Sequence, residues 1–135
     1  PDAVRAWSRG AALEIRRPSA TRPWQHVLEP LAAYLCLAER LTIDPAAATG
    51  AWNFGPSAAC NLSVRETVEL ARAHWPAAPV RYADTTDGPH EAHWLALDAT
   101  RAADRLGLRP RWPVSEAVAR TMAWYRAVAD GADAH

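Results

Sequence analysis

Helix-like segments alternate with short apolar runs along this chain, and that alternation limits the folds it can adopt. Apolar spacing typical of helices occurs at residues 1–9, 29–40, 64–75, 98–107 and from 115 onward. Strand-like runs occur at residues 13–16, 25–27, 51–55, 80–82 and 94–97. With 135 residues, the chain has the length of one domain. The order of these segments predicts a mixed α/β fold.

Three of these segments carry signals that fix their type. Ser63 stands three residues before Glu66, which is the spacing of a capping box, so a helix is expected to begin there. The helix expected at 29–40 places Leu31, Tyr34 and Leu35 on one apolar face. Residues 51–55 are short, aromatic and bounded by glycines, which predicts a buried strand.

Charge and cysteine content narrow the class of protein. Fifteen acidic residues balance fifteen basic ones, which argues against a nucleic-acid or membrane partner. All the basic residues are arginines, so a mechanism that requires lysine is excluded for this chain. Cys36 and Cys60 form no CxxC motif, which favours two buried thiols in a reducing cytoplasm. The chain begins with Pro1 rather than Met, so we expect it to be a piece of a longer protein.

The sequence lacks several familiar catalytic motifs. The six glycines form neither a GxGxxG turn nor a P-loop, so the chain does not cradle a cofactor's pyrophosphate in the usual glycine-rich way. The run from His90 to His93 is one residue too short for an HExxH zinc motif, and a polar loop beside a pocket is the preferred interpretation. No GxSxG is present and neither cysteine has a nucleophile setting, so no catalytic residue is predicted.

Arg22 and Asn53 are the best candidates for binding residues. Arg22 follows a turn and precedes the segment leading into the helix at 29–40, and its planar guanidinium suits bidentate contact with phosphate. A surface arginine stacked on Trp24 fits the sequence equally well. Asn53 lies inside an aromatic run and either satisfies local backbone or points at a ligand. For the seven tryptophans, core packing is favoured over stacking on carbohydrate.

Four blocks of sequence together resemble a known family. RPWQHVLEPLAAYLCLAERL, GAWNFGP, PHEAHWLALD and RLGLRPRW occur in this order and span nearly the whole chain. In sequence and spacing they resemble the CDP-glucose 4,6-dehydratases. These enzymes are extended short-chain dehydrogenase/reductases that act on nucleotide sugars.

The resemblance implies an NAD-dependent enzyme that converts CDP-D-glucose to CDP-4-dehydro-6-deoxy-D-glucose and water. In that family a glycine-rich Rossmann loop and a Tyr-x-x-x-Lys pair serve the chemistry, and this chain has neither. It therefore resembles the C-terminal, nucleotide-sugar-binding part, without the N-terminal Rossmann core that holds NAD. Residues 25–55 are expected to supply a helix and a strand that return to the missing sheet. The full-length enzyme is expected to be a cytoplasmic homo-oligomer.

The resemblance also implies roles for particular residues. Arg22 is expected to hold the pyrophosphate, with Asn53 beside the same phosphates. The stretch from Glu14 to Arg16 is expected to line the nucleoside side. The loop with His90 stands where relatives offer another phosphate contact, often an arginine. Two alternatives stay open: an epimerase or dehydratase for another nucleotide sugar, and a nucleotide-binding module without catalysis.

Overall fold

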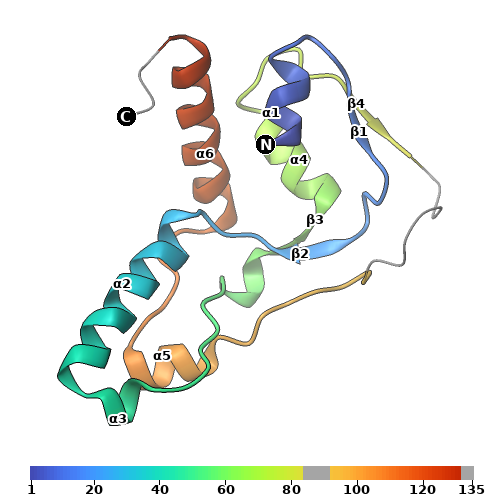
Figure 1. Cartoon of the computed structure of the whole chain (residues 1–135). Helices are drawn as coiled ribbons and strands as arrows, with labels where there is room; N and C mark the ends of the chain where they lie inside the picture. Colours follow the sequence, from blue (N-terminus) through green and yellow to red (C-terminus); the bar gives the residue numbers. More distant parts are fainter. Residues whose placement is uncertain (84–91, 132–135) are drawn as a thin grey trace.

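The computed structural model describes residues 1–83 and 92–131 and confirms a mixed α/β fold (Figure 1). In chain order its elements are α1 (Asp2–Trp7), β1 (Leu13–Ile15), β2 (Thr21–Pro23), α2 (Leu28–Ile43), α3 (Pro45–Ala48), a 3-10 turn (Ala58–Cys60), β3 (Asn61–Ser63), α4 (Val64–Arg72), β4 (Val80–Tyr82), α5 (Thr100–Leu106) and α6 (Val114–Ala129). Within the described residues, no helix is both long and apolar enough to span a membrane.

The strands form two separate ladders. β1 pairs in parallel with β4, with Leu13 opposite Val80. β2 pairs antiparallel with β3, with Arg22 opposite Leu62. Figure 1 shows the β2–β3 ladder between two groups of helices, with α1, α4 and α6 on one side and α2, α3 and α5 on the other.

The hydrophobic core lies among α1, α4, α6 and the β1–β4 ladder. Its buried centre consists of Trp7, Leu13, Ala78 and Met122. Partly buried side chains from α4, α6 and β4 pack around this centre, among them Val68, Val118 and Val80. The indole N–H of Trp7 also donates a hydrogen bond of 3.1 Å to the carbonyl of Pro79. Core packing and this bond together hold α1 against the start of β4.

The group formed by α2, α3 and α5 buries no large side chain among the described residues. Its buried residues are small alanines, Ala33, Ala48 and Ala102. The large apolar side chains of α2 and of the residues before it are exposed instead: Val27, Leu28, Leu31, Tyr34, Leu35, Leu41 and Ile43. The apolar face predicted for this helix is therefore present, and it lies open.

Local signals in the sequence set several element boundaries as expected. The capping box forms: the Ser63 hydroxyl accepts a bond from the Glu66 N–H, and the Glu66 carboxylate accepts one from the Ser63 N–H. Gly107 ends α5 with φ of 69°, a left-handed conformation that favours glycine. α2 begins one residue earlier and ends three residues later than predicted, and α6 begins one residue earlier.

The strand predictions were less accurate. No strand forms at residues 25–27, because the pairing with β3 engages residues 21–23 instead. Residues 51–55 are not a strand either, since no segment of the described chain pairs with them. Residues 94–97 contribute a single parallel bridge, between Trp94 and Thr21.

Burial predictions also need two corrections. Cys60 is buried as expected, but Cys36 on α2 is only half-buried because that helix lacks cover. Trp7 is buried and most of the other tryptophans are partly buried, but Trp94 and Trp124 are exposed. Core packing therefore does not explain every tryptophan.

Candidate functional site

The segment from Arg22 to Gln25 is fastened to three other parts of the chain by its side chains. Arg22 Nη1 donates to the carbonyls of Thr21 at 2.8 Å and Ala92 at 2.9 Å. The Trp24 indole donates to the carbonyl of Leu62 at 2.9 Å. The Gln25 amide donates to the carbonyl of Phe54 at 3.0 Å. These bonds tie residues 22–25 to three distant stretches of backbone.

Two backbone carbonyls accept hydrogen bonds from Arg22. In the part of the chain that the structure describes, the cation–π contacts are made by Arg65, Arg101 and Arg120. The stacking of Arg22 on Trp24, which the sequence allowed, is not among them. Two carbonyls on one guanidinium nitrogen fix the direction of the side chain, and a guanidinium has five N–H donors. Arg22 is thus a partly buried, oriented cation.

Asn53 lies against the same stretch of chain as Arg22. Its Nδ2 donates to the carbonyl of Asp98 at 3.2 Å, while Arg22 binds the carbonyl of Ala92. Between these two contacts the backbone at Gly55 approaches Leu97 so closely that a Cβ at Gly55 would lie 2.8 Å from the Leu97 Cβ. Arg22 thus contacts the beginning of residues 92–98 and Asn53 contacts their end.

Side chains take the place of a strand partner for residues 51–55. Arg101 Nη1 donates to the carbonyl of Ala51 at 2.8 Å, and its guanidinium lies 4.1 Å from the ring centre of Trp52. The Gln25 amide donates to the carbonyl of Phe54 in the same segment. The segment is thereby held at α5 without joining either ladder.

Glu14 and Arg16 lie at β1, in a different part of the molecule from Asn53. Both are exposed, and Glu14 forms an ion pair of 3.2 Å with Arg81 on the neighbouring strand. The N–H of Ala83 donates to the carbonyl of Ile15 at 2.8 Å. The chain therefore leaves the Glu14–Arg16 region at Ala83 and returns beside Arg22 at Ala92. His90 lies between them, outside the described residues.

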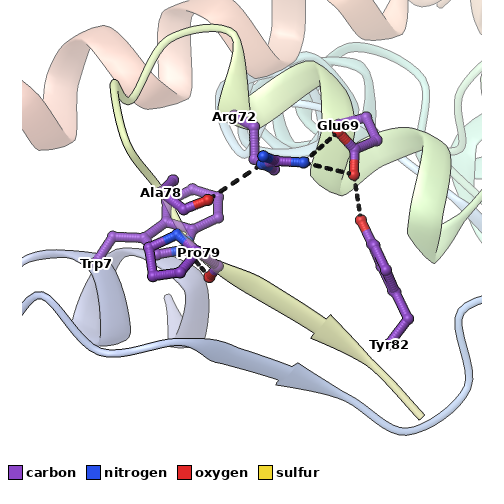
Figure 2. Close-up of polar contacts among 6 residues, drawn as sticks. All are labelled: Trp7, Glu69, Arg72, Ala78, Pro79 and Tyr82. Atoms are coloured by element: carbon purple, nitrogen blue, oxygen red, sulfur yellow. Dashed lines mark hydrogen bonds and ion pairs between the residues drawn. The ribbon is translucent and has the colours of Figure 1, made fainter.

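A polar network fixes β4, the partner strand of β1, against α4 (Figure 2). The Tyr82 hydroxyl donates to Glu69 Oε1 at 2.6 Å. Arg72 Nη1 binds both oxygens of the same carboxylate, at 3.1 and 2.9 Å, and its Nε donates to the carbonyl of Ala78 at 3.1 Å. In Figure 2, Glu69 lies between Tyr82 and Arg72, so one carboxylate joins the strand to the helix.

The network shifts the pKa values of its acidic groups in opposite directions. The hydrogen bond from Tyr82 lowers the pKa of Glu69 against an opposing effect of burial, with further lowering by Arg72 and Arg65. Burial, together with the bond to Glu69, raises the pKa of Tyr82 to about 12. Arg65 covers the Tyr82 ring at 3.9 Å from its centre. At neutral pH the phenol is thus protonated and the carboxylate ionised.

A pocket of about 360 Å³ opens between α2 and α5. Its lining includes Gln25, Glu29 and Cys36 on or just before α2. On or after α5 it includes Ala102 and Trp112. Glu29 Oε1 accepts hydrogen bonds from the backbone N–H groups of Arg111 and Trp112. The carboxylate thus joins the beginning of α2 to the segment that precedes α6.

Sequence reasoning overlooked these supporting residues. Gln25 and Glu29 stand inside the block that carries the family resemblance, but a sequence does not indicate which distant backbone groups they bind. Tyr82 and Glu69 were parts of a predicted strand and helix, and alternation of apolar and polar residues does not reveal a bond between them. The structure shows no cluster of three His, Cys, Asp or Glu side chains suited to a metal ion among the residues that it describes.

Comparison with known proteins agrees with the sequence resemblance. No protein-family model matches the chain. It is 38% identical over 133 residues to CDP-glucose 4,6-dehydratase of Salmonella typhimurium, an alignment that covers 98% of this chain and 37% of that enzyme. The chain therefore spans little more than a third of this relative.

Solved structures match the fold. The PbgP3 protein of Burkholderia pseudomallei superposes with a TM-score of 0.72 at 21% identity, over 96% of this chain and 39% of that one. RMD of Pseudomonas aeruginosa, complexed with NADPH, superposes with a TM-score of 0.69 at 18% identity, over 94% of this chain and 41% of that one. Both resemblances, like the sequence match, cover a minor share of the longer protein. The chain is thus homologous to a part of CDP-glucose 4,6-dehydratase and has the fold of a portion of an extended short-chain dehydrogenase/reductase.

Proposed function

We propose that this chain is the C-terminal, nucleotide-sugar-binding part of a CDP-glucose 4,6-dehydratase. The observation that carries the proposal is the 38% identity to the Salmonella enzyme along 98% of the chain. The reaction of the full-length enzyme is then the conversion of CDP-D-glucose to CDP-4-dehydro-6-deoxy-D-glucose and water. The matched region is 37% of that relative, so the fragment by itself is proposed to be inactive.

Arg22 is proposed to bind the pyrophosphate. A guanidinium presents a planar fork that matches two phosphate oxygens, and its positive charge strengthens both bonds. The contacts with the Thr21 and Ala92 carbonyls support this role, because an oriented side chain loses less freedom when a ligand binds. Asn53 is proposed to assist, since its Nδ2 carries a second hydrogen besides the one directed at Asp98.

The nucleoside is proposed to lie along Glu14–Arg16, with the loop of His90 closer to the phosphates. Support comes from the course of the chain on either side of that loop. Ala83 is bonded to Ile15, and Ala92 is bonded to Arg22. A ligand that reaches from β1 to β2 would therefore contact Glu14–Arg16 at one end and Arg22 at the other.

NAD does not fit the residues of this chain. The six glycines provide no turn for a dinucleotide pyrophosphate, and the lysine of a Tyr-x-x-x-Lys pair is missing. NAD, which accepts and returns hydride in this reaction class, is proposed to bind a Rossmann domain outside the matched region. The residues here then orient the nucleotide sugar toward that domain. We further propose that the full-length enzyme is a cytoplasmic homo-oligomer.

The exposed face of α2 and residues 51–55 are proposed to pack on the same Rossmann domain. Leu31 and Leu35 are exposed although they are large and apolar, which is unfavourable for a face that stays in water. The carbonyls of Ala51 and Phe54 are bound by side chains rather than by a neighbouring strand. A sheet outside this chain would give both segments a partner.

An assay of the full-length enzyme tests the proposed function. The proposal predicts NAD-dependent formation of the 4-dehydro-6-deoxy product from CDP-glucose, in preference to UDP-, dTDP- and GDP-sugars. Turnover of another nucleotide sugar with no activity on CDP-glucose would reassign the substrate. Epimerisation without loss of water would reassign the reaction, and nucleotide binding without turnover would make it a binding module.

Substitution of Arg22 tests the residue that matters most to the proposal. In the full-length enzyme, Arg22→Ala is expected to weaken CDP-glucose binding by about 2–5 kcal/mol if the ion pair is buried. Arg22→Lys keeps the charge but loses the fork, so it should weaken binding by a smaller, measurable amount. Titration calorimetry gives both values, and NAD affinity serves as the control because it should not change. A dissociation constant for CDP-glucose that matches the wild type would remove Arg22 from the site.

A further inference from the structure

Glu29 uses only one of its two carboxylate oxygens. Oε1 accepts two backbone hydrogen bonds, from Arg111 at 2.6 Å and from Trp112 at 3.1 Å. Oε2 is buried and has no hydrogen-bond partner in the described chain. Buried polar atoms in folded proteins nearly always have a partner, so an acceptor of this kind needs an explanation.

The surroundings of Glu29 indicate what could serve as the partner. Glu29 lines the pocket of about 360 Å³ between α2 and α5, whose other walls are largely apolar. Arg109 and Arg111 also line it, which makes the pocket a poor site for a metal ion or another cation. An uncharged group that donates a hydrogen bond fits both the acceptor and the apolar walls.

The pocket is continuous with the surface proposed to be covered in the full-length enzyme. Leu28 lines the pocket and also belongs to the exposed apolar residues of α2. The chain spans 37% of its sequence relative, so most of that enzyme's length has no counterpart here. A segment that packs on α2 would pass the mouth of the pocket.

We propose that the part of the enzyme outside this chain inserts an uncharged hydrogen-bond donor, a hydroxyl, amide or indole group, into this pocket against Glu29 Oε2. The inference rests on the proposed function only in requiring a further domain that packs on α2. Glu29 then has two roles. Oε1 binds the segment before α6 to α2, and Oε2 accepts a hydrogen bond from the neighbouring domain.

Glu29→Gln in the full-length enzyme separates these two roles. Glutamine keeps a carbonyl oxygen that can accept from both Arg111 and Trp112, and it places an amide N–H₂ where Oε2 was. If a donor from the other domain faces Oε2, two donors oppose each other in the variant. The thermal unfolding midpoint should then fall by about 2 °C or more. An exposed carboxylate at the end of α6 provides a matched control, since Asp130→Asn removes the same charge and should leave the midpoint unchanged.

Labelling of Cys36 gives a second measurement that needs no substitution. Cys36 lines the same pocket and is half-buried in this chain. In the native full-length enzyme an occupied pocket should shield it, so peptide mapping after treatment with a thiol reagent should find Cys36 unlabelled until the protein is unfolded. Rapid labelling of Cys36 in the native enzyme, or an unchanged midpoint for Glu29→Gln, would overturn the proposal. Neither readout depends on which nucleotide sugar is the substrate, so its failure is distinguishable from failure of the proposed function.

Discussion

The half of the molecule built from α1, β1, β4, α4 and α6 buries or partly buries most of its large apolar side chains, whereas most of those on α2 are exposed. Trp7 is 5% exposed and Met122 is 4% exposed, but Leu35 is 74% exposed and Ile43 is 70% exposed. Both halves contain amphipathic helices of similar length, since α2 and α6 each have 16 residues. The difference is therefore one of available partners rather than of helix-forming sequence.

Partner availability also explains how each half is connected. In the first half, β1 pairs with β4 within the chain. The Glu69 carboxylate joins α4 to β4 through its bonds with Tyr82 and Arg72. In the second half, residues 51–55 are held by side chains such as Arg101 and Gln25. The comparison shows one core that is packed within the chain and one apolar surface that the described residues leave uncovered.

The largest expected effect comes from a pair of substitutions, Trp7→Ala and Leu35→Ala, made in both this chain and the full-length enzyme. Trp7→Ala should lower the free energy of unfolding by about 3–5 kcal/mol in both, because it leaves a cavity in the core and removes one of the two donors to the Pro79 carbonyl. Leu35→Ala should change it by less than about 0.5 kcal/mol in this chain, where the side chain is exposed. In the full-length enzyme the same change should cost about 2–5 kcal/mol.

Urea denaturation followed by circular dichroism provides these values. An equal effect of Leu35→Ala in the two proteins would mean that α2 remains uncovered in the full-length enzyme. A large effect of Leu35→Ala in this chain alone would mean that the chain covers α2 by itself, for example by pairing with a second copy.

Elements determined by neighbouring residues were predictable from the sequence. The Ser63 capping box fixed the beginning of α4, and Gly107 fixed the end of α5, because in each case the determining groups lie within a few residues. The apolar face of α2 was also readable from its spacing.

Elements determined by distant partners were not predictable in the same way. Residues 51–55 have the composition of a buried strand, but a strand also needs a pairing partner, and the described chain offers none. β2 falls at residues 21–23 rather than 25–27 because β3 lies opposite that stretch. Composition alone does not encode which segments meet.

The candidate site was predictable at the level of residue type and only partly at the level of position. Arg22 and Asn53 were identified from local context; the structure gives their contacts with Ala92 and Asp98, six residues apart, and their binding roles stay proposals. Glu14 and Arg16 lie on the other ladder, and His90 lies outside the described residues, so their roles remain proposals. The second function of Glu29 emerged only from its contacts, since an acidic residue at the start of a helix is common in any protein.

A smaller effect is expected from pH in the well-packed half. The pKa of Tyr82 is raised to about 12, so its contact with Glu69 contributes stability below about pH 10 and loses it as pH rises toward 12. The pKa of Glu69 is lowered, so its contribution is present above its ordinary pKa of 4.5 and is lost as pH falls below that value. The difference in phenolate absorbance between wild type and Tyr82→Phe isolates this group. A difference titration centred near pH 10 would contradict the contact.

Amide hydrogen exchange tests the central claim most directly, because it reports on both halves of the molecule at once. The rates for this chain and for the full-length enzyme should agree within α4 and α6, whose partners lie inside the chain. Within α2, exchange should be at least about tenfold slower in the full-length enzyme, because packing against another domain suppresses local opening of the helix. Equal exchange of α2 in the two proteins would contradict the account, since it would mean that this apolar helix has no partner in the enzyme either.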